Sequence, residues 1–180
     1  MKKWFAYGGI VASVILVAFG AGAIVIGATG LKDVRDELAE QRIVAGDDAP
    51  ELTDGRLEVG EEIDTGAEAR AFADVMEAHT LEATGGKRYA EMGRFLTADG
   101  TDTNDEAEAA KTEDGRPVEN GLRNMWVTET ALSTALNTAF FAERVAVFSI
   151  VMGVALLLTG VGFLVLTLSG LLGTSRRGTA

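Results

Sequence analysis

The sequence predicts an all-α fold in which two transmembrane helices extend into a small helical extracytoplasmic domain. No charged residue occurs from Trp4 to Leu31, and none occurs from Val145 to Ser175. Each stretch exceeds the roughly 20 apolar residues that a helix needs to cross about 30 Å of hydrocarbon. All 27 acidic residues lie between these stretches, from Asp33 to Glu143. Apolar ends therefore flank an acidic, water-soluble middle.

Basic residues at the two ends predict the orientation. Lys2 and Lys3 precede the first span, and Arg176 and Arg177 follow the second. Because short cytoplasmic flanks are enriched in Lys and Arg, both termini are expected in the cytoplasm. The expected divisions are residues 1–30 (cytoplasmic tail and first span), 31–144 (extracytoplasmic domain), 145–174 (second span) and 175–180 (cytoplasmic tail).

The charge of the middle segment restricts its partners. Its 12 basic and 27 acidic residues leave a formal charge of −15. Such a domain repels nucleic acid and anionic headgroups, so cations or basic proteins suit it better. The first span also resembles a signal peptide, with small residues at Ala28-Thr29-Gly30. Its apolar core is longer than the roughly 7–15 residues of a signal peptide, so we expect it to be retained.

Periodicity and breakers predict the elements of the middle segment. Helical spacing continues from the first span to about Val44, and Gly46 to Pro50 ends it. Near-period-two apolar residues from Glu51 to Asp64 predict a short hairpin. Thr65 and Glu68 form a capping-box pattern that starts a helix, which ends at Thr84-Gly85-Gly86.

The remainder of the middle segment divides into three parts. A short helix is expected from about Tyr89 to Leu96. Residues 97–120 contain almost no large apolar side chain, so a mobile loop is expected there. Helical spacing then resumes at Leu122 and continues without a breaker through the second span to about Leu172.

Small residues recur every seven positions along one face of each span. Small side chains let helices approach closely in lipid, and a seven-residue repeat favours a left-handed, near-antiparallel crossing. We expect the two faces to pack against each other within one chain, although either could instead face another subunit. The predicted packing residues are Ala6, Ser13, Gly20 and Gly27 in the first span, and Ala146, Gly153, Gly160 and Thr167 in the second.

Few side chains suggest chemistry. His79 is the only histidine and Ser133 the only serine of the middle segment, and cysteine is absent. A lone histidine cannot form the two-histidine, one-carboxylate iron site, so a structural role is expected. The residues Asp102, Asn104, Glu106 and Glu113 match four positions of a calcium loop, but Ala107 stands where the sharp turn requires glycine. No cofactor, metal site or catalytic residue is therefore predicted. Arg70, Lys87, Arg88, Arg94 and Arg123 are expected to pair with the abundant acids.

Two blocks of the sequence carry a family resemblance. The first runs from Ala71 to Met92 and includes His79-Thr-Leu-Glu-Ala-Thr84-Gly-Gly86; the second runs from Arg123 to Phe141 into the second span. Together with the order of span, outward domain and span, they resemble a family of small actinobacterial membrane proteins often labelled "aromatic ring-opening dioxygenase". The resemblance implies a recurring two-span architecture, with residues 97–120 as an insertion.

Neither span contains a charged residue, and the expected function is based on this absence. Transport pathways and proton relays usually need such a residue within the membrane. We expect a non-catalytic accessory or interaction subunit of a membrane complex or cell-envelope assembly. Its expected partners are the lipid bilayer and another membrane protein, not nucleic acid, with a homo-oligomer as a further state. The alternative is an extracytoplasmic sensor or binding module for cations or an envelope ligand.

Overall fold

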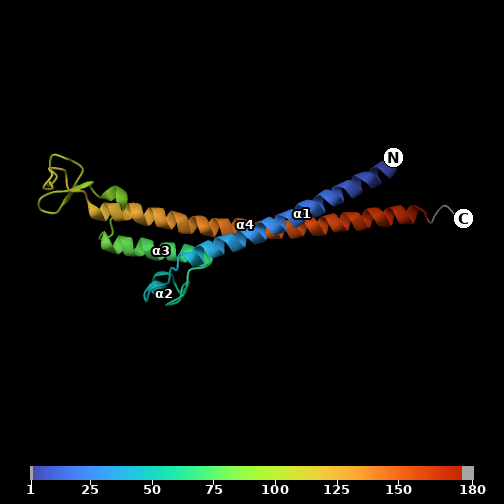
Figure 1. Cartoon of the computed structure of the whole chain (residues 1–180), viewed down its shortest axis with the longest axis horizontal. Helices are drawn as coiled ribbons and strands as arrows, with labels where there is room; N and C mark the ends of the chain where they lie inside the picture. The colour runs from blue at the N-terminus through green and yellow to red at the C-terminus, as the bar shows by residue number, and fades with distance from the viewer. Residues whose placement is uncertain (1, 176–180) are drawn as a thin grey trace. The chain divides into compact units, whose positions relative to one another are not determined.

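The computed structural model describes residues 2–175, and the polypeptide is mostly helical (Figure 1). The long helices are α1 (Lys2–Glu40) and α4 (Gly121–Ser175), and α3 (Gly66–Ala83) lies between them in the sequence. The short elements are helix α2 (Ala49–Leu52), the 3-10 turn η1 (Tyr89–Glu91) and strands β1 (Phe95–Leu96) and β2 (Asp102–Thr103). Of the expected tail 175–180, residues 176–180 lie outside the described part.

The chain divides into two compact units. The first comprises Met1–Asp36 and Phe141–Ala180, and the second comprises Glu37–Phe140. These boundaries fall several residues from the predicted span limits at 31 and 144, because each long helix continues from one unit into the other. The boundaries of the two units are set by which residues pack together, whereas the predicted limits were set by where charged residues begin and end.

In the first unit, α1 and α4 pack along one face each. Ser13, Gly20 and Gly27 are buried on α1, and Gly153 and Gly160 are buried on α4. The remaining faces expose large apolar side chains, such as Phe19 and Leu158. Both helices are long and apolar enough to cross a membrane, and only 11% of each most apolar window is buried within the protein. An apolar surface left uncovered to this extent is compatible with a membrane protein in contact with lipid.

The second unit has a small core of its own. Leu57, Ile63 and Val75 are buried there together with Trp126 of α4. Alanines predominate on the buried face of α3, namely Ala69, Ala71 and Ala73. Figure 1 shows α3 beside the N-terminal part of α4. The predicted capping box begins α3: Thr65 accepts a hydrogen bond from the Glu68 amide, and the Glu68 carboxylate accepts one from the Thr65 amide.

The start of the second unit differs from expectation. Helix α1 ends at Glu40, not Val44, because Arg42 adopts a left-handed backbone with φ of 53°. The expected hairpin at 51–64 does not form. Instead, Ile63 and Gly60 donate hydrogen bonds to Ile43 and Ala45, so residues 43–45 supply the pairing partner. Short-range spacing detects an extended segment but cannot identify its partner.

The region that follows α3 also differs from the predictions. The expected helix from Tyr89 to Leu96 is limited to η1, after which Phe95 and Leu96 join β2 in an antiparallel pair. Residues 97–120, expected as a mobile loop, form specific backbone hydrogen bonds. Leu96 pairs with both Val118 and Ala110, and Thr112 pairs with Arg116. Backbone pairing can order a polar segment that has few apolar side chains, which composition alone does not reveal.

Candidate functional site

The structure places the predicted packing residues of the two spans along one antiparallel contact. A Cβ atom added to Gly20 would lie 2.7 Å from the carbonyl oxygen of Gly153, and one added to Gly27 would lie 2.6 Å from that of Ala146. A Cβ atom on Gly160 would lie 3.0 Å from the carbonyl oxygen of Ser13. The separations at Gly20 and Gly27 are too short for any side chain, and the one at Gly160 leaves almost no room, so glycine permits the backbone contact.

The end of this contact near the N-terminus is less regular. Ala6 is half-buried, and Thr167 lies against Gly9, whose added Cβ atom would be 2.6 Å from the Thr167 hydroxyl. Gly9 is a packing residue that the seven-residue repeat missed. The signal that could have found it is its place one turn from Ser13, whose hydroxyl donates to the Gly9 carbonyl at 2.7 Å.

An ion pair crosses the two helices beyond the uncharged stretches. The guanidinium of Arg35 on α1 lies 3.3 Å from the carboxylate of Glu143 on α4. Arg35 follows the first uncharged stretch by a few positions, and Glu143 precedes the second. The pair therefore suits the boundary between hydrocarbon and water and complements the glycine contact.

The candidates for catalysis are engaged in structural contacts. His79 pairs with Asp48, which precedes α2, and the hydrogen bond from His79 lowers the pKa of that carboxyl. Both side chains are about half exposed. The Ser133 hydroxyl donates to the Glu129 carboxylate at 2.6 Å. These contacts give each residue a structural partner.

The four residues that match a calcium loop serve different contacts. Asp102 accepts hydrogen bonds from the Gly93 amide and the Lys87 ammonium group, and the Asn104 side chain accepts one from the Arg94 amide. Glu106 and Glu113 are exposed. Within residues 2–175, no group of three or more histidine, aspartate and glutamate side chains is placed to hold a metal ion.

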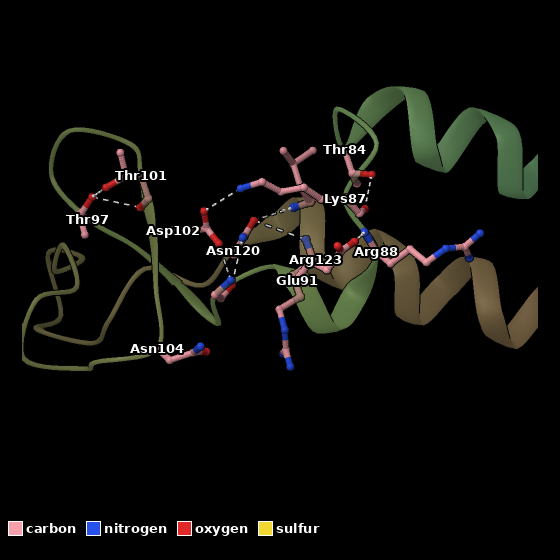
Figure 2. Close-up of polar contacts among 12 residues, drawn as sticks. Thr84, Lys87, Arg88, Glu91, Thr97, Thr101, Asp102, Asn104, Asn120 and Arg123 are labelled. Atoms are coloured by element: carbon pink, nitrogen blue, oxygen red, sulfur yellow. Dashed lines mark hydrogen bonds and ion pairs between the residues drawn. The ribbon is translucent and has the colours of Figure 1, made fainter.

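A polar junction joins the end of α3, the β1–β2 hairpin and the start of α4 (Figure 2). We define it by Thr84, Lys87, Arg88, Gly93, Arg94, Asp102, Asn120, Arg123 and Trp126. The Lys87 carbonyl accepts hydrogen bonds from the Thr84 hydroxyl at 2.7 Å and from the Trp126 ring nitrogen at 2.9 Å. These bonds attach the end of α3 to α4.

Within the polar junction, Asn120 connects the segment before β1 to the start of α4. Its side-chain nitrogen donates to the Gly93 carbonyl at 3.0 Å, and its side-chain oxygen accepts from the amides of Leu122 and Arg123. Its own amide donates to the Arg94 carbonyl at 2.9 Å. Asn120 is only 3% exposed and therefore both caps α4 and holds the segment before β1.

Asp102 anchors the hairpin to the polar junction. The hydrogen bond from the Gly93 amide, followed by that from Lys87, lowers the pKa of the Asp102 carboxyl. Gly93 has no room for a side chain, because an added Cβ atom would lie 2.5 Å from the Thr103 amide nitrogen. Neither Asn120 nor Gly93 was singled out from the sequence, since their contacts connect segments that are distant in the chain.

The basic residues divide into two groups. Arg70 lies 4.0 Å from Asp74, Lys87 3.2 Å from Asp102 and Arg88 2.7 Å from Glu77, as the excess of acids predicts. Arg94 and Arg123 lie over aromatic rings without an ion pair, whereas Arg88 has both its ion pair and a ring contact, 5.7 Å from the centre of the Trp126 ring. The Arg123 guanidinium is 3.8 Å from the centre of the Tyr89 ring, and that of Arg94 is 5.3 Å from the centre of the Phe95 ring.

Comparisons with known proteins do not suggest a function, so the functional proposal is based on the geometry of the structure. No family model matches this chain, and no curated protein or solved structure matches it. The resemblance to the actinobacterial two-span proteins stays a prediction.

Proposed function

We propose that this protein is a non-catalytic accessory or interaction subunit of a membrane assembly. In this proposal both spans cross the bilayer, both termini are cytoplasmic, and residues 31–144 lie outside the membrane. Three features support it: the exposed apolar faces of α1 and α4, the uncharged glycine contact between them, and the structural engagement of His79 and Ser133. A docking subunit needs no ionisable group in its spans.

One surface of the second unit carries the proposal. We call it the α4 neutral face, and it consists of the exposed residues of α4 from Val127 to Thr138. Glu129 is the only charged residue between Val127 and Thr138, and it is buried. The neutral face comprises Val127, Thr128, Thr130, Ala131, Leu132, Thr134, Ala135 and Thr138.

Such a surface is unusual for a helix that faces water. Exposed helix positions normally carry charged side chains, and α3 exposes Arg70, His79 and Glu82. The α4 neutral face instead combines small residues with half-exposed Val127 and Leu132. Depletion of charge is typical of the centre of a protein interface, and small residues allow a second helix to approach closely. We infer that a helix of another membrane protein packs on this face.

Photocrosslinking in native membranes tests this function. A photoreactive residue at Ala131 on the neutral face is expected to form a covalent adduct with a different membrane protein. The same residue at Ala67, an exposed alanine at the start of α3, serves as the matched control and should form none. Adducts only with a second copy of the chain, or equal yields at both positions, would contradict an accessory role through this face.

A further inference from the structure

Two arginines of the polar junction lack an acidic partner in a domain that has a large excess of acids. No carboxylate lies within 4.0 Å of the guanidinium of Arg94 or Arg123 among residues 2–175. The Nε atom of Arg123 is also buried and has no hydrogen-bond partner there. A buried donor left without an acceptor is costly and requires an explanation.

The backbones of the two arginines are joined by the same residue. The Asn120 amide donates to the Arg94 carbonyl, and the Asn120 side chain accepts from the Arg123 amide. Asn120 is buried, so this arrangement belongs to the fixed core of the polar junction. The Tyr89 ring further positions the guanidinium of Arg123, and the Phe95 ring positions that of Arg94.

Stacking on a ring prepares a guanidinium for binding. The ring occupies one face of the planar group, while the N–H donors radiate from its edge. A carboxylate or phosphate accepts two such donors in a bidentate arrangement, and little side-chain freedom is lost because the group is already fixed. The Arg123 side chain is partly exposed although its Nε atom is buried, so the terminal N–H groups are the donors accessible from solvent.

Two cations of the polar junction have no neighbouring carboxylate, although the domain as a whole is acidic. Lys87 and Arg88 are paired with Asp102 and Glu77, whereas Arg94 and Arg123 have no carboxylate within 4.0 Å among residues 2–175. The segment around them has a formal charge of −15. Because screening limits exposed charges to about 10 Å, a compact anion experiences these two cations, whereas a long polyanion would extend into the acidic surroundings.

We propose that Arg123 forms a binding site for a single oxyanion of the carboxylate or phosphate type. The terminal N–H groups of the Arg123 guanidinium provide the principal contact, and the buried Nε–H beside them serves as a reporter of binding. Tyr89 fixes the plane of that guanidinium, and Arg94 adds positive charge to the same polar junction. This site lies in the second unit and does not depend on a partner at the α4 neutral face.

Arginine side-chain NMR on the detergent-solubilised full chain tests the site. Sodium acetate and sodium phosphate are titrated separately, and sodium chloride at equal ionic strength serves as the reference. We expect a saturable shift of the Arg123 Nε–H signal at millimolar concentration with at least one oxyanion. Saturation with acetate indicates a carboxylate ligand, and saturation with phosphate alone indicates a phosphate group.

Variants separate binding from general electrostatics. Arg123→Gln should weaken binding at least tenfold, and Arg123→Lys should also weaken it because the ammonium group keeps the charge but loses the bidentate edge. Arg116→Gln is the matched control, since Arg116 is exposed and pairs with Asp114 at 3.4 Å. Circular dichroism establishes that each variant is folded. The site would be overturned if chloride produced the same shifts, or if folded Arg123→Gln and Arg123→Lys bound as tightly as Arg116→Gln.

Discussion

At the scale of single residues, the second unit depends on side chains that join distant segments. Asp102 holds Gly93 and Lys87, and Asn120 holds Gly93 and Arg94. The sequence shows an acidic segment in which charged partners are plentiful, but it does not specify which partners meet. Arg123 illustrates this, because its guanidinium lies on Tyr89 and not beside a carboxylate.

The lowered pKa of Asp102 predicts a dependence of stability on pH. Because the folded pKa lies below that of the unfolded chain, about 3.9, the carboxylate contributes fully above the unfolded value. The contribution is lost as the pH falls through the folded pKa. Asp102→Asn should therefore reduce stability by about 1.5–3 kcal/mol at neutral pH, the typical value of a hydrogen bond to a charged group. The difference from the unmodified protein should diminish as the pH falls below 4.

Thermal unfolding in mild detergent, followed by circular dichroism between pH 3 and pH 7, measures this difference. Asp114→Asn is the matched control, because Asp114 is exposed and contacts Arg116 at the surface. A destabilisation by Asp102→Asn that is equal at every pH would contradict the assigned role of the carboxylate.

At the scale of elements, glycine determines how closely α1 and α4 approach. The seven-residue repeat identified one face on each helix, and Gly20, Gly27, Gly153 and Gly160 lie at backbone contacts on those faces. A periodic pattern reveals this because the helix converts sequence spacing directly into a surface. The loop segments differ in this respect: the pairing of residues 43–45 with 60–63 depends on tertiary contact, and no local period encodes it.

Leucine substitutions test the contact between the helices. Gly20→Leu and Gly153→Leu should each destabilise the protein by about 1–3 kcal/mol, the usual range for overpacking, because the backbones must separate. Gly22→Leu and Gly162→Leu are matched controls, since an added Cβ atom at either position meets nothing within 4 Å. The measurement is the midpoint of thermal unfolding in detergent. Equal midpoints for the contact and control variants would exclude this packing.

At the scale of the whole molecule, helix length requires segments outside the bilayer. Helix α4 has 55 residues and, at about 1.5 Å per residue, a length of about 80 Å. The hydrocarbon core is about 30 Å thick, so a spanning α4 extends beyond it. The basic flanks predict that the domain lies outside the cell and that both ends lie inside.

Cysteine labelling in intact cells tests this orientation, because the protein has no native cysteine. A membrane-impermeant maleimide should label a Glu113→Cys variant, since Glu113 is exposed in the acidic segment. A Thr179→Cys variant should react only after the cells are permeabilised. Labelling of Thr179→Cys in intact cells, with protection of Glu113→Cys, would reverse the proposed orientation.

The sequence by itself determined the two long apolar helices, their small-residue faces, and the capping box that begins α3. Each of these follows from local composition or from a helical period, which nearby residues encode. Only the tertiary structure decided the pairing of residues 43–45, the order within 97–120, and the polar junction where Arg123 stacks on Tyr89. Those features depend on contacts between segments far apart in the chain, and their energies arise only when the chain has folded.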